Sequence, residues 1–321
     1  MRFQKVLVFA LAAAVMVTTT AAVRARAQSN PFLGNWNITG DPPNTANIYW
    51  LQVKDEGGTL SALFLNRGGS PVAAKDVKIA NGELTFTMGG DNPKNVVSLK
   101  EVGGKLTGTV GETAIKVTGE RPPTWGPCDA NAAHTFGKPV VLFDGKSVDA
   151  WTPQNKDKAL MWSVADGAMT NEPHGNNLVS KEKFKDFKIE AEYKLSPKGN
   201  SGIYLRGRYE MQVLDDMGQT DDREHGHMSI YSAKAPMVNA SKPAGEWQTV
   251  QITIVGNCVS ATLNGQKIHD NSKLTRITGG ALDAKETEPG PIMIQGDHEV
   301  VWFRKVVVTP ITGSASGTKT Q

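Results

Sequence analysis

Short apolar runs alternate with turn residues along most of the chain, and helical periodicity is nearly absent. Between residues 32 and 120 the runs are separated by Gly, Asn and Asp, and Asn81 with Gly82 marks a hairpin turn. Short strands at this spacing are typical of a small antiparallel barrel or sandwich. The pattern therefore predicts an all-β accessory domain over residues 30–120, with both architectures open and no catalytic cluster in it.

A proline-rich segment interrupts this pattern. Pro122, Pro123 and Pro127 fall within seven residues, and proline resists both helix and central strand. We interpret residues 121–136 as a linker. About ten further strand-like runs over residues 137–311 favour a large antiparallel β-sandwich. The Gly/Ser/Thr-rich tail, residues 312–321, is predicted to be disordered.

The N-terminus has the pattern of a cleaved secretory signal. Arg2 and Lys5 precede an apolar run over residues 6–17, and small residues flank Arg26 just before Gln28. The run is short for a membrane span, and no later segment is apolar for long enough. We expect residues 1–27 to be removed and the rest to be a soluble periplasmic or secreted protein without membrane insertion.

Charge changes the expectation about partners. Residues 1–27 contain four basic residues and no acidic one, so the remaining chain carries 31 Lys and Arg against 32 Asp and Glu. Nucleic-acid binding normally needs a basic face. We therefore expect no nucleic-acid partner.

The chain has two cysteines, Cys128 in the linker and Cys258 in a predicted strand-to-strand turn. Export permits a disulfide. The sequence leaves open whether the two pair, which would tie the linker to the second domain, or remain separate thiols.

Charged residues concentrate in two neighbouring predicted strands over residues 199–216. Because side chains alternate between strand faces, Tyr204 and Arg206 share one side of the first strand, and Glu210 and Gln212 share one side of the second. A strand that only fills a core does not carry these residues. The pattern indicates a polar sheet face suited to the floor of a sugar cleft.

Seven segments of the second domain carry motifs, at residues 141–151, 162–169, 177–195, 200–215, 239–257, 263–268 and 290–308. Together and in this order they resemble the 3-keto-disaccharide hydrolase family, a concanavalin A-like jelly-roll sandwich. The resemblance covers residues from about 139 to 311 and says nothing about residues 30–120. It implies a jelly-roll fold for the second domain.

The resemblance also implies cleavage of a glycoside whose C3 hydroxyl another enzyme has already oxidised to a ketone. The carbonyl acidifies the hydrogen on C2, so a base can form an enolate that expels the C1 substituent, and water then adds to give net hydrolysis. This route needs a base near C2 and a group that stabilises the enolate oxygen, and an acid for the leaving group is optional.

Mapped onto this chain, the resemblance implies a site around the polar strand pair. Glu210 is the expected base or, alternatively, a carboxylate beside a metal ion. Arg206 is the expected group that stabilises the enolate, and His298 is the expected acid or base near neutral pH. The residues expected to bind the sugar are Gln212, Asn200, Tyr204, Gln295 and Asp297.

A divalent cation chelated by O2 and O3 of the sugar would also stabilise an enolate. Asp215 and His227 carry suitable ligand groups, although Asp215 also suits a turn and His227 a solvated loop. We expect no organic cofactor, because no dinucleotide or P-loop motif is present.

Two other functions remain open. The same architecture hosts lectins, so the second domain is alternatively a non-catalytic carbohydrate-binding module. A conventional glucanase needs a pair of carboxylates, which Glu210 would form with Asp215 or Glu192. The sequence departs from many relatives at Glu299 and Lys305, and Glu299 adds a carboxylate beside His298.

Overall fold

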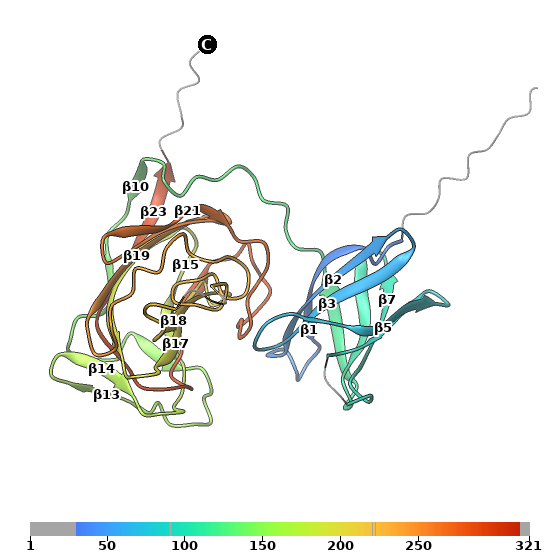
Figure 1. The fold of residues 1–321 in the computed structure, drawn as a ribbon, viewed down its shortest axis with the longest axis horizontal. Helices are drawn as coiled ribbons and strands as arrows, with labels where there is room; N and C mark the ends of the chain where they lie inside the picture. Colours follow the sequence, from blue (N-terminus) through green and yellow to red (C-terminus); the bar gives the residue numbers. More distant parts are fainter. Residues whose placement is uncertain (1–29, 90–91, 220, 222, 315–321) are drawn as a thin grey trace, which may run out of the picture. The chain divides into compact units, whose positions relative to one another are not determined.

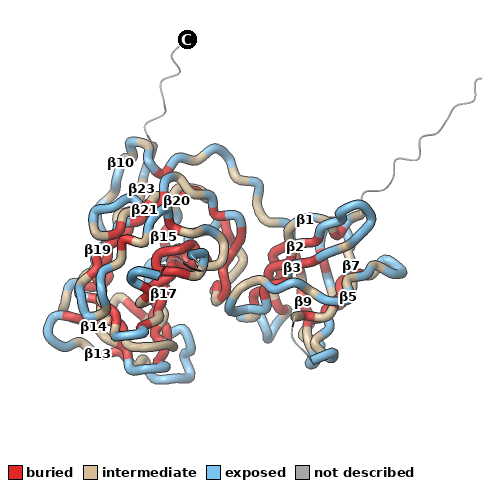
Figure 2. The backbone as a smooth tube through the Cα atoms, in the orientation of Figure 1, coloured by how far each residue is buried: buried red, intermediate tan, exposed pale blue. Residues whose placement is uncertain are grey.

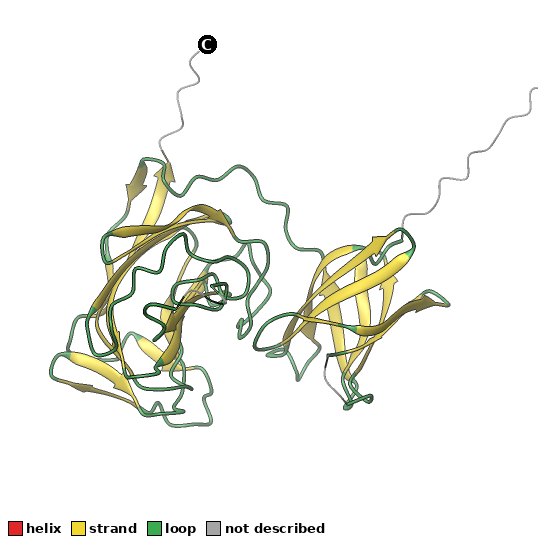
Figure 3. Ribbon diagram, in the orientation of Figure 1, coloured by secondary structure: helices red, strands yellow, loops and turns green. Residues whose placement is uncertain are grey.

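The computed structural model describes residues 30–89, 92–219, 221 and 223–314. The predicted signal peptide lies outside these ranges, as do residues 315–321 of the predicted tail. The described residues from Phe32 onward form one compact unit, in which the regular elements are strands joined by turns and long loops (Figure 3). Within the described part of the chain, no helix has the length and apolarity needed to cross a membrane.

Nine antiparallel strands form the N-terminal sheet. They are β1 (Gly34–Gly40), β2 (Ile48–Glu56), β3 (Thr59–Asn66), β4 (Val72–Ala73), β5 (Lys75–Ala80), β6 (Glu83–Thr87), β7 (Val96–Val102), β8 (Lys105–Val110) and β9 (Ile115–Glu120). Their order is β4-β3-β2-β1-β9-β8-β7-β6-β5. The sheet curls around a buried core that includes Trp36, Phe64 and Leu99 (Figure 1). One curved sheet is closer to the predicted barrel than to a sandwich of two sheets.

The predicted linker is extended only in its first part. Residues 121–133 contain no strand, but β10 (His134–Phe136) pairs with β23 (Val301–Ser314), so the linker ends three residues earlier than predicted. Cys128 and Cys258 form a disulfide, with 5.9 Å between their Cα atoms. This settles the open pairing and ties the linker to the sandwich. The strand β23 also extends past Ile311, where the sequence placed the end of the domain.

The second domain is a sandwich of two antiparallel sheets, as the sequence predicted. The larger has nine strands, with β13-β14-β23-β16-β19-β20-β21 in order and with β10 and β11 also paired to β23. The smaller has five, in the order β12-β15-β22-β17-β18. The remaining bounds are β11 (Val140–Phe143), β12 (Trp151–Pro153), β13 (Trp162–Ala165), β14 (Ala168–Asn171), β15 (Leu178–Phe184), β16 (Phe187–Leu195), β17 (Asn200–Leu205), β18 (Tyr209–Leu214), β19 (Gln248–Val255), β20 (Cys258–Leu263), β21 (Gln266–Lys273) and β22 (Gly290–Ile294).

Strict alternation along β16 packs the larger sheet against the core. Phe187, Ile189 and Tyr193 are fully buried on its inner face. The side chains between them, such as Glu190 and Glu192, point to the other face and are partly exposed. Side chains two residues apart share a strand face. The alternation of apolar and polar residues along β16 therefore gives one apolar face and one polar, partly exposed face.

The strands β17 and β18 are buried on both faces, and this positions the site. Ile203 and Met211 belong to the apolar core. The other face carries polar groups, yet Glu210 and Gln212 are also buried. Loops cause this second burial: residues 228–231 hydrogen-bond along β18, and residues 278–280 contact Arg208 and Tyr204. Figure 2 shows the buried backbone along β17 and its neighbours.

Candidate active site

A small polar cavity of about 280 Å³ lies over the outer face of β17 and β18. The strand register places Tyr204 opposite Glu210 and Gly202 opposite Gln212. β22 runs beside β17 and contributes Met293, with Gln295 directly after its end. The residues that line the cavity are Gly68, Gly69, Gln154, Asn177, Asn200, Tyr204, Glu210, Gln212, Tyr231, Gly279, Gly280, Met293, Gln295, Asp297 and His298.

Glu210 is the buried carboxylate of this cavity, with 4% of its surface exposed. The Tyr204 hydroxyl donates to Glu210 Oε2 over 2.8 Å. Burial raises the pKa of Glu210 to about 8; the Tyr204 hydrogen bond opposes the rise and the negative charge of Asp297 adds to it. Desolvation disfavours a charged carboxylate, so Glu210 can hold or release a proton near neutral pH.

Tyr204 links Glu210 to its neighbours. Its hydroxyl lies 2.9 Å from the carbonyl oxygen of Gly279 and accepts a hydrogen bond of 2.9 Å from Gln295 Nε2. Burial, followed by the nearby charge of Glu210, raises the pKa of Tyr204 well above its ordinary value. Tyr204 therefore stays protonated and serves as a fixed donor.

Two glycines leave room for these groups. A Cβ at Gly202 would lie 2.6 Å from Glu210 Oε1, and a Cβ at Gly280 would lie 2.7 Å from the Tyr204 hydroxyl oxygen. Real Cβ atoms do not approach other atoms this closely. The Glu210 carboxylate can therefore occupy its position only because residue 202, opposite Gln212, is a glycine.

Two amide oxygens at the cavity have no partner. Asn200 Oδ1 and Gln295 Oε1 are buried and accept no hydrogen bond within the described part of the chain. An unsatisfied buried acceptor costs about 1–3 kcal/mol. A ligand hydroxyl donating to these oxygens would remove that cost, so the cavity suits a molecule rich in hydroxyl groups.

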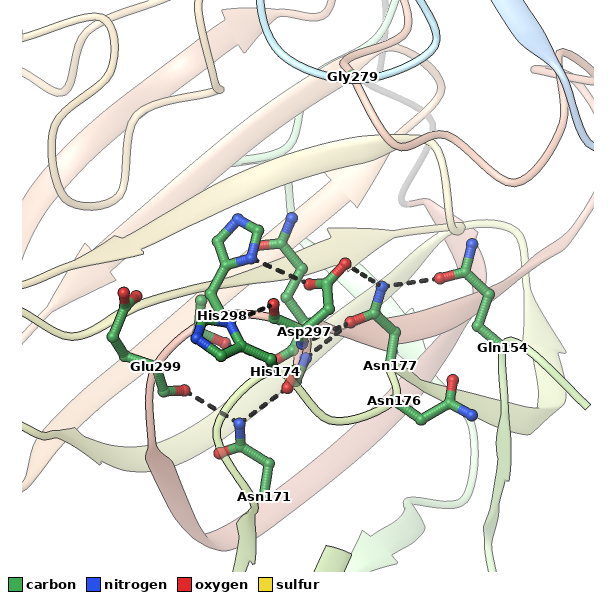
Figure 4. A network of polar contacts seen from close by, with 12 residues as sticks. Gln154, Asn171, His174, Asn176, Asn177, Gly279, Asp297, His298 and Glu299 are labelled. Atoms are coloured by element: carbon green, nitrogen blue, oxygen red, sulfur yellow. Dashed lines mark hydrogen bonds and ion pairs between the residues drawn. The ribbon is translucent and has the colours of Figure 1, made fainter. Parts of the chain in front are cut away.

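The loop after β22 carries Asp297 and His298, and Asn177 fixes it (Figure 4). Asn177 Oδ1 accepts the N–H groups of Gly296 at 2.7 Å and Asp297 at 3.2 Å. Asn177 Nδ2 donates to Asp297 Oδ2 at 3.3 Å and to Gln154 Oε1 at 2.7 Å. The loop is therefore held in place although its side chains are partly exposed.

His298 stands at the cavity with its ring next to Asp297. Its Nδ1 lies 3.3 Å from Asp297 Oδ1, and 40% of its side chain is exposed. His174 donates its backbone N–H to the carbonyl oxygen of His298 over 2.8 Å. An imidazole beside a carboxylate in a solvent-accessible position can exchange protons with both a ligand and water.

The expectation that Arg206 lies in the site is wrong. β17 ends at Leu205, and Arg206 occupies the turn to β18 with a φ of 55°. Its Nε donates to the carbonyl oxygen of Lys185 at 2.5 Å, and its Nη2 donates to Asp186 Oδ1 at 2.9 Å. Because β17 ends before Arg206, the alternation of side chains no longer puts Arg206 on the same face as Tyr204. The Arg206 guanidinium fixes the turn instead.

The two metal-ligand candidates also lie away from the cavity. Asp215 accepts the Lys198 N–H at 2.8 Å. His227 is buried, its Nε2 lies 2.7 Å from the Tyr193 hydroxyl, and its Nδ1 contacts the backbone of Leu214. Among the described residues, no three His, Cys, Asp or Glu side chains come together as a metal site. These donors do not fit a resident cation, so we derive no step through one.

Neither predicted carboxylate partner of Glu210 reaches the cavity. Asp215 is engaged as described above, and Glu192 pairs with Arg304 at 2.5 Å on the larger sheet. Asp297 is the second carboxylate that lines the cavity.

The structure brings seven of the predicted site residues together: Asn200, Tyr204, Glu210, Gln212, Gln295, Asp297 and His298. Sequence reasoning missed Gln154, Asn177 and Tyr231, and the glycine pairs at 68–69 and 279–280. These residues lie in loops or strand ends whose contacts depend on the folded topology, and no spacing in the sequence marks them.

Comparisons with known proteins place this site in context. A sequence model for the 3-keto-alpha-glucoside-1,2-lyase-like domain matches residues 138–309, more than half of the chain. A curated 3-keto-disaccharide hydrolase from Bacteroides thetaiotaomicron is 24% identical over 223 residues, covering 53% of this chain and 77% of that protein.

Two crystal structures of candidate glycosyl hydrolases from Parabacteroides distasonis also align with this chain. One is 27% identical and covers 59% of this chain and 94% of its own, with a TM-score of 0.48. The other is 18% identical and covers 54% and 94%, with a TM-score of 0.46.

Proposed function

Because the chain belongs to the family of 3-keto-alpha-glucoside-1,2-lyase-like domains, we propose that its sandwich domain cleaves glycosides that carry a ketone at C3. The observation that carries the proposal is the buried Glu210 carboxylate at the cavity, whose pKa is raised to about 8. A carboxylate with a raised pKa is a stronger base than an exposed one, and a catalytic base works best with a pKa near the working pH.

In the proposed reaction, Glu210 takes the proton from C2, and the electron pair of the C–H bond forms an enolate with the C3 carbonyl. The enolate then expels the C1 substituent, which leaves a C1–C2 double bond. Water adds its oxygen to C1 and a proton to C2, while Glu210 releases the proton it took to solvent, and the net result is hydrolysis.

The developing charge and the leaving group each need a partner. The Val213 N–H donates to Gln212 Oε1 over 3.1 Å, so the amide NH₂ of Gln212 is the half suited to donate to the enolate oxygen, in place of Arg206. We assign the proton for the leaving group to His298, whose ring is oriented by Asp297. Preorganised donors of this kind stabilise charge that appears in the transition state.

The test is product release from a 3-keto glucoside beside its unoxidised parent, with and without a chelator. Cleavage of the keto substrate alone supports the proposal. Sugar binding without cleavage of either would favour the carbohydrate-binding alternative, and cleavage of the unoxidised parent would favour a conventional glucanase that uses Glu210 and Asp297. Loss of turnover with the chelator, restored by added cation, would support the alternative in which a divalent cation stabilises the enolate, although the described residues assemble no metal site.

We also propose that the protein acts outside the cytoplasm, on substrate supplied by a separate enzyme that oxidises the C3 hydroxyl. The N-terminal sequence pattern supports export, and so does the Cys128–Cys258 disulfide. Fractionation of producing cells, with N-terminal sequencing of the mature protein, tests it. A chain that starts at Met1 and stays in the cytoplasm would contradict this proposal.

A further inference from the structure

One boundary of the candidate cavity comes from outside the family domain. Gly68 and Gly69 line the cavity, although they belong to the loop between β3 and β4 of the N-terminal sheet. The matched family region begins only at residue 138. The loop and the sandwich lie within the same compact unit.

The backbone of this loop contacts the residues around Tyr204. The Gly280 N–H donates to the carbonyl oxygen of Arg67 over 2.7 Å. A Cβ at Gly279 would lie 2.3 Å from the carbonyl oxygen of Gly69. Since Gly279 and Gly280 themselves contact the Tyr204 hydroxyl, the loop packs one layer away from the Tyr204–Glu210 pair.

A side-chain contact fixes the other end of the loop. Ser70 Oγ lies 2.7 Å from His225 Nε2, and the His225 ring packs edge-on against Tyr231 with 5.1 Å between ring centroids. Tyr231 also lines the cavity. Contacts at both ends therefore hold the two glycines at the cavity.

The neighbouring part of the N-terminal sheet packs into the core of the sandwich. Ile48, Trp50 and Leu65 belong to the same buried cluster as Met211 and Ile230. The Arg276 guanidinium lies 5.4 Å from the centre of the Trp50 ring. This buried packing and the two anchored ends support a fixed loop.

We infer that the Arg67–Gly68–Gly69–Ser70 loop is a specificity element of the active site. The absence of side chains at Gly68 and Gly69 makes room for the second sugar of a 3-keto disaccharide. The inference rests on the proposed function and adds the role of the N-terminal domain. A cavity of about 280 Å³ is at the lower end of small-molecule sites, about 300–1,000 Å³. One added side chain therefore removes a large share of it.

Gly68→Phe tests the inference by activity. Gly68 has no atom within 4 Å of an added Cβ and an ordinary φ, so the substitution leaves the backbone unstrained. We expect KM for a 3-keto disaccharide to rise about tenfold or more, with little change for a methyl 3-keto glucoside. Gly126→Phe is the matched control, because Gly126 is equally open and does not line the cavity. An equal effect on both substrates, or no effect, would overturn the inference.

A second measurement does not need turnover. The two native cysteines are paired, so Gly68→Cys, introduced together with Glu210→Gln, adds a single free thiol for maleimide labelling. We expect bound 3-keto disaccharide to slow labelling about tenfold or more, as a buried thiol reacts slowly, with no protection at Gly126→Cys. Binding without protection at position 68 would overturn this inference alone. Failure of the substrate to bind at all would overturn the proposed function as well.

Discussion

Glu190 lies on the larger sheet of the sandwich and Glu210 on the smaller one. Their environments shift their pKa values in opposite directions. Glu190, on β16, is 26% exposed, and the Lys188 hydrogen bond lowers its pKa. Glu210, on β18, is buried, and desolvation raises its pKa to about 8. The polar face of β16 is partly exposed and Lys188 and Lys305 pair with Glu190 there, whereas loops cover the polar face of β18. The covering of a polar face, rather than its sequence, decides whether a carboxylate can act as a base.

The largest expected effect separates these two carboxylates. Glu210→Gln removes the proposed base while keeping the shape and the Tyr204 contact, so kcat on a 3-keto glucoside should fall about 10²–10⁴-fold. Sugar binding should persist. Glu190→Gln is the matched control and should leave turnover unchanged. Equal turnover in both variants would remove Glu210 from the mechanism.

The next effect tests how tightly the covered face is packed. Gly202→Ala would place a methyl group 2.6 Å from Glu210 Oε1, so the carboxylate must move. Because a misplacement of about 1 Å can cost about 100-fold in rate, we expect kcat to drop between tenfold and that limit. Gly126→Ala, where the added Cβ meets nothing within 4 Å, is the control. Full activity in Gly202→Ala would show that the carboxylate position is not critical.

Asn177→Ala tests the loop that carries Asp297 and His298. The substitution leaves the N–H groups of Gly296 and Asp297 without an acceptor. We expect the free energy of unfolding to fall by about 1–3 kcal/mol, together with a lower kcat. Asn131→Ala removes an exposed asparagine that bonds Asp270, and it should change neither quantity measured by denaturant titration and steady-state assay.

The pH profile gives a smaller effect with a definite sign. A base must be ionised, so kcat/KM should rise with pH through an apparent pKa of about 8. Tyr204→Phe removes the hydrogen bond that favours the ionised form, so the rising limb should move up by about one pH unit. Asp297→Asn removes a like charge and should move the limb down. Shifts in the reverse directions would contradict the assigned causes.

Stability against pH distinguishes the two carboxylates most subtly. Folding raises the pKa of Glu210, so its stabilising contribution is present below its unfolded pKa and is lost as the pH rises through about 8. Folding lowers the pKa of Glu190, so its contribution is present above its unfolded pKa and is lost as the pH falls. Denaturant titrations across pH measure both contributions as differences in the free energy of unfolding. The advantage of the unsubstituted protein over Glu210→Gln should shrink as the pH rises, and its advantage over Glu190→Gln should shrink as the pH falls.

Sequence patterning predicts the strands well because period-2 alternation reports burial directly. It indicated an all-β fold, and it assigned Tyr204 and Glu210 to two neighbouring strands, which pair in the structure. It was wrong for Arg206, since the strand ends at Leu205 and the turn redirects the next side chain.

The remaining site residues depend on contacts between distant segments. Asn177 and Asp297 are 120 residues apart, and Gly68 and Gly280 are farther apart still. Local patterns carry no record of such pairings, so the loop anchors could be found only in the folded chain.

Proton removal from C2 of a 3-keto glycoside by Glu210 can be measured directly. Cleavage is run in D₂O and followed by NMR of the released sugar, with free product incubated without protein as the control for spontaneous exchange. We expect product formed by the unsubstituted protein to carry deuterium at C2 beyond that control, and Glu210→Gln to form almost no product. Product that retains the original hydrogen at C2 would rule out this role of Glu210.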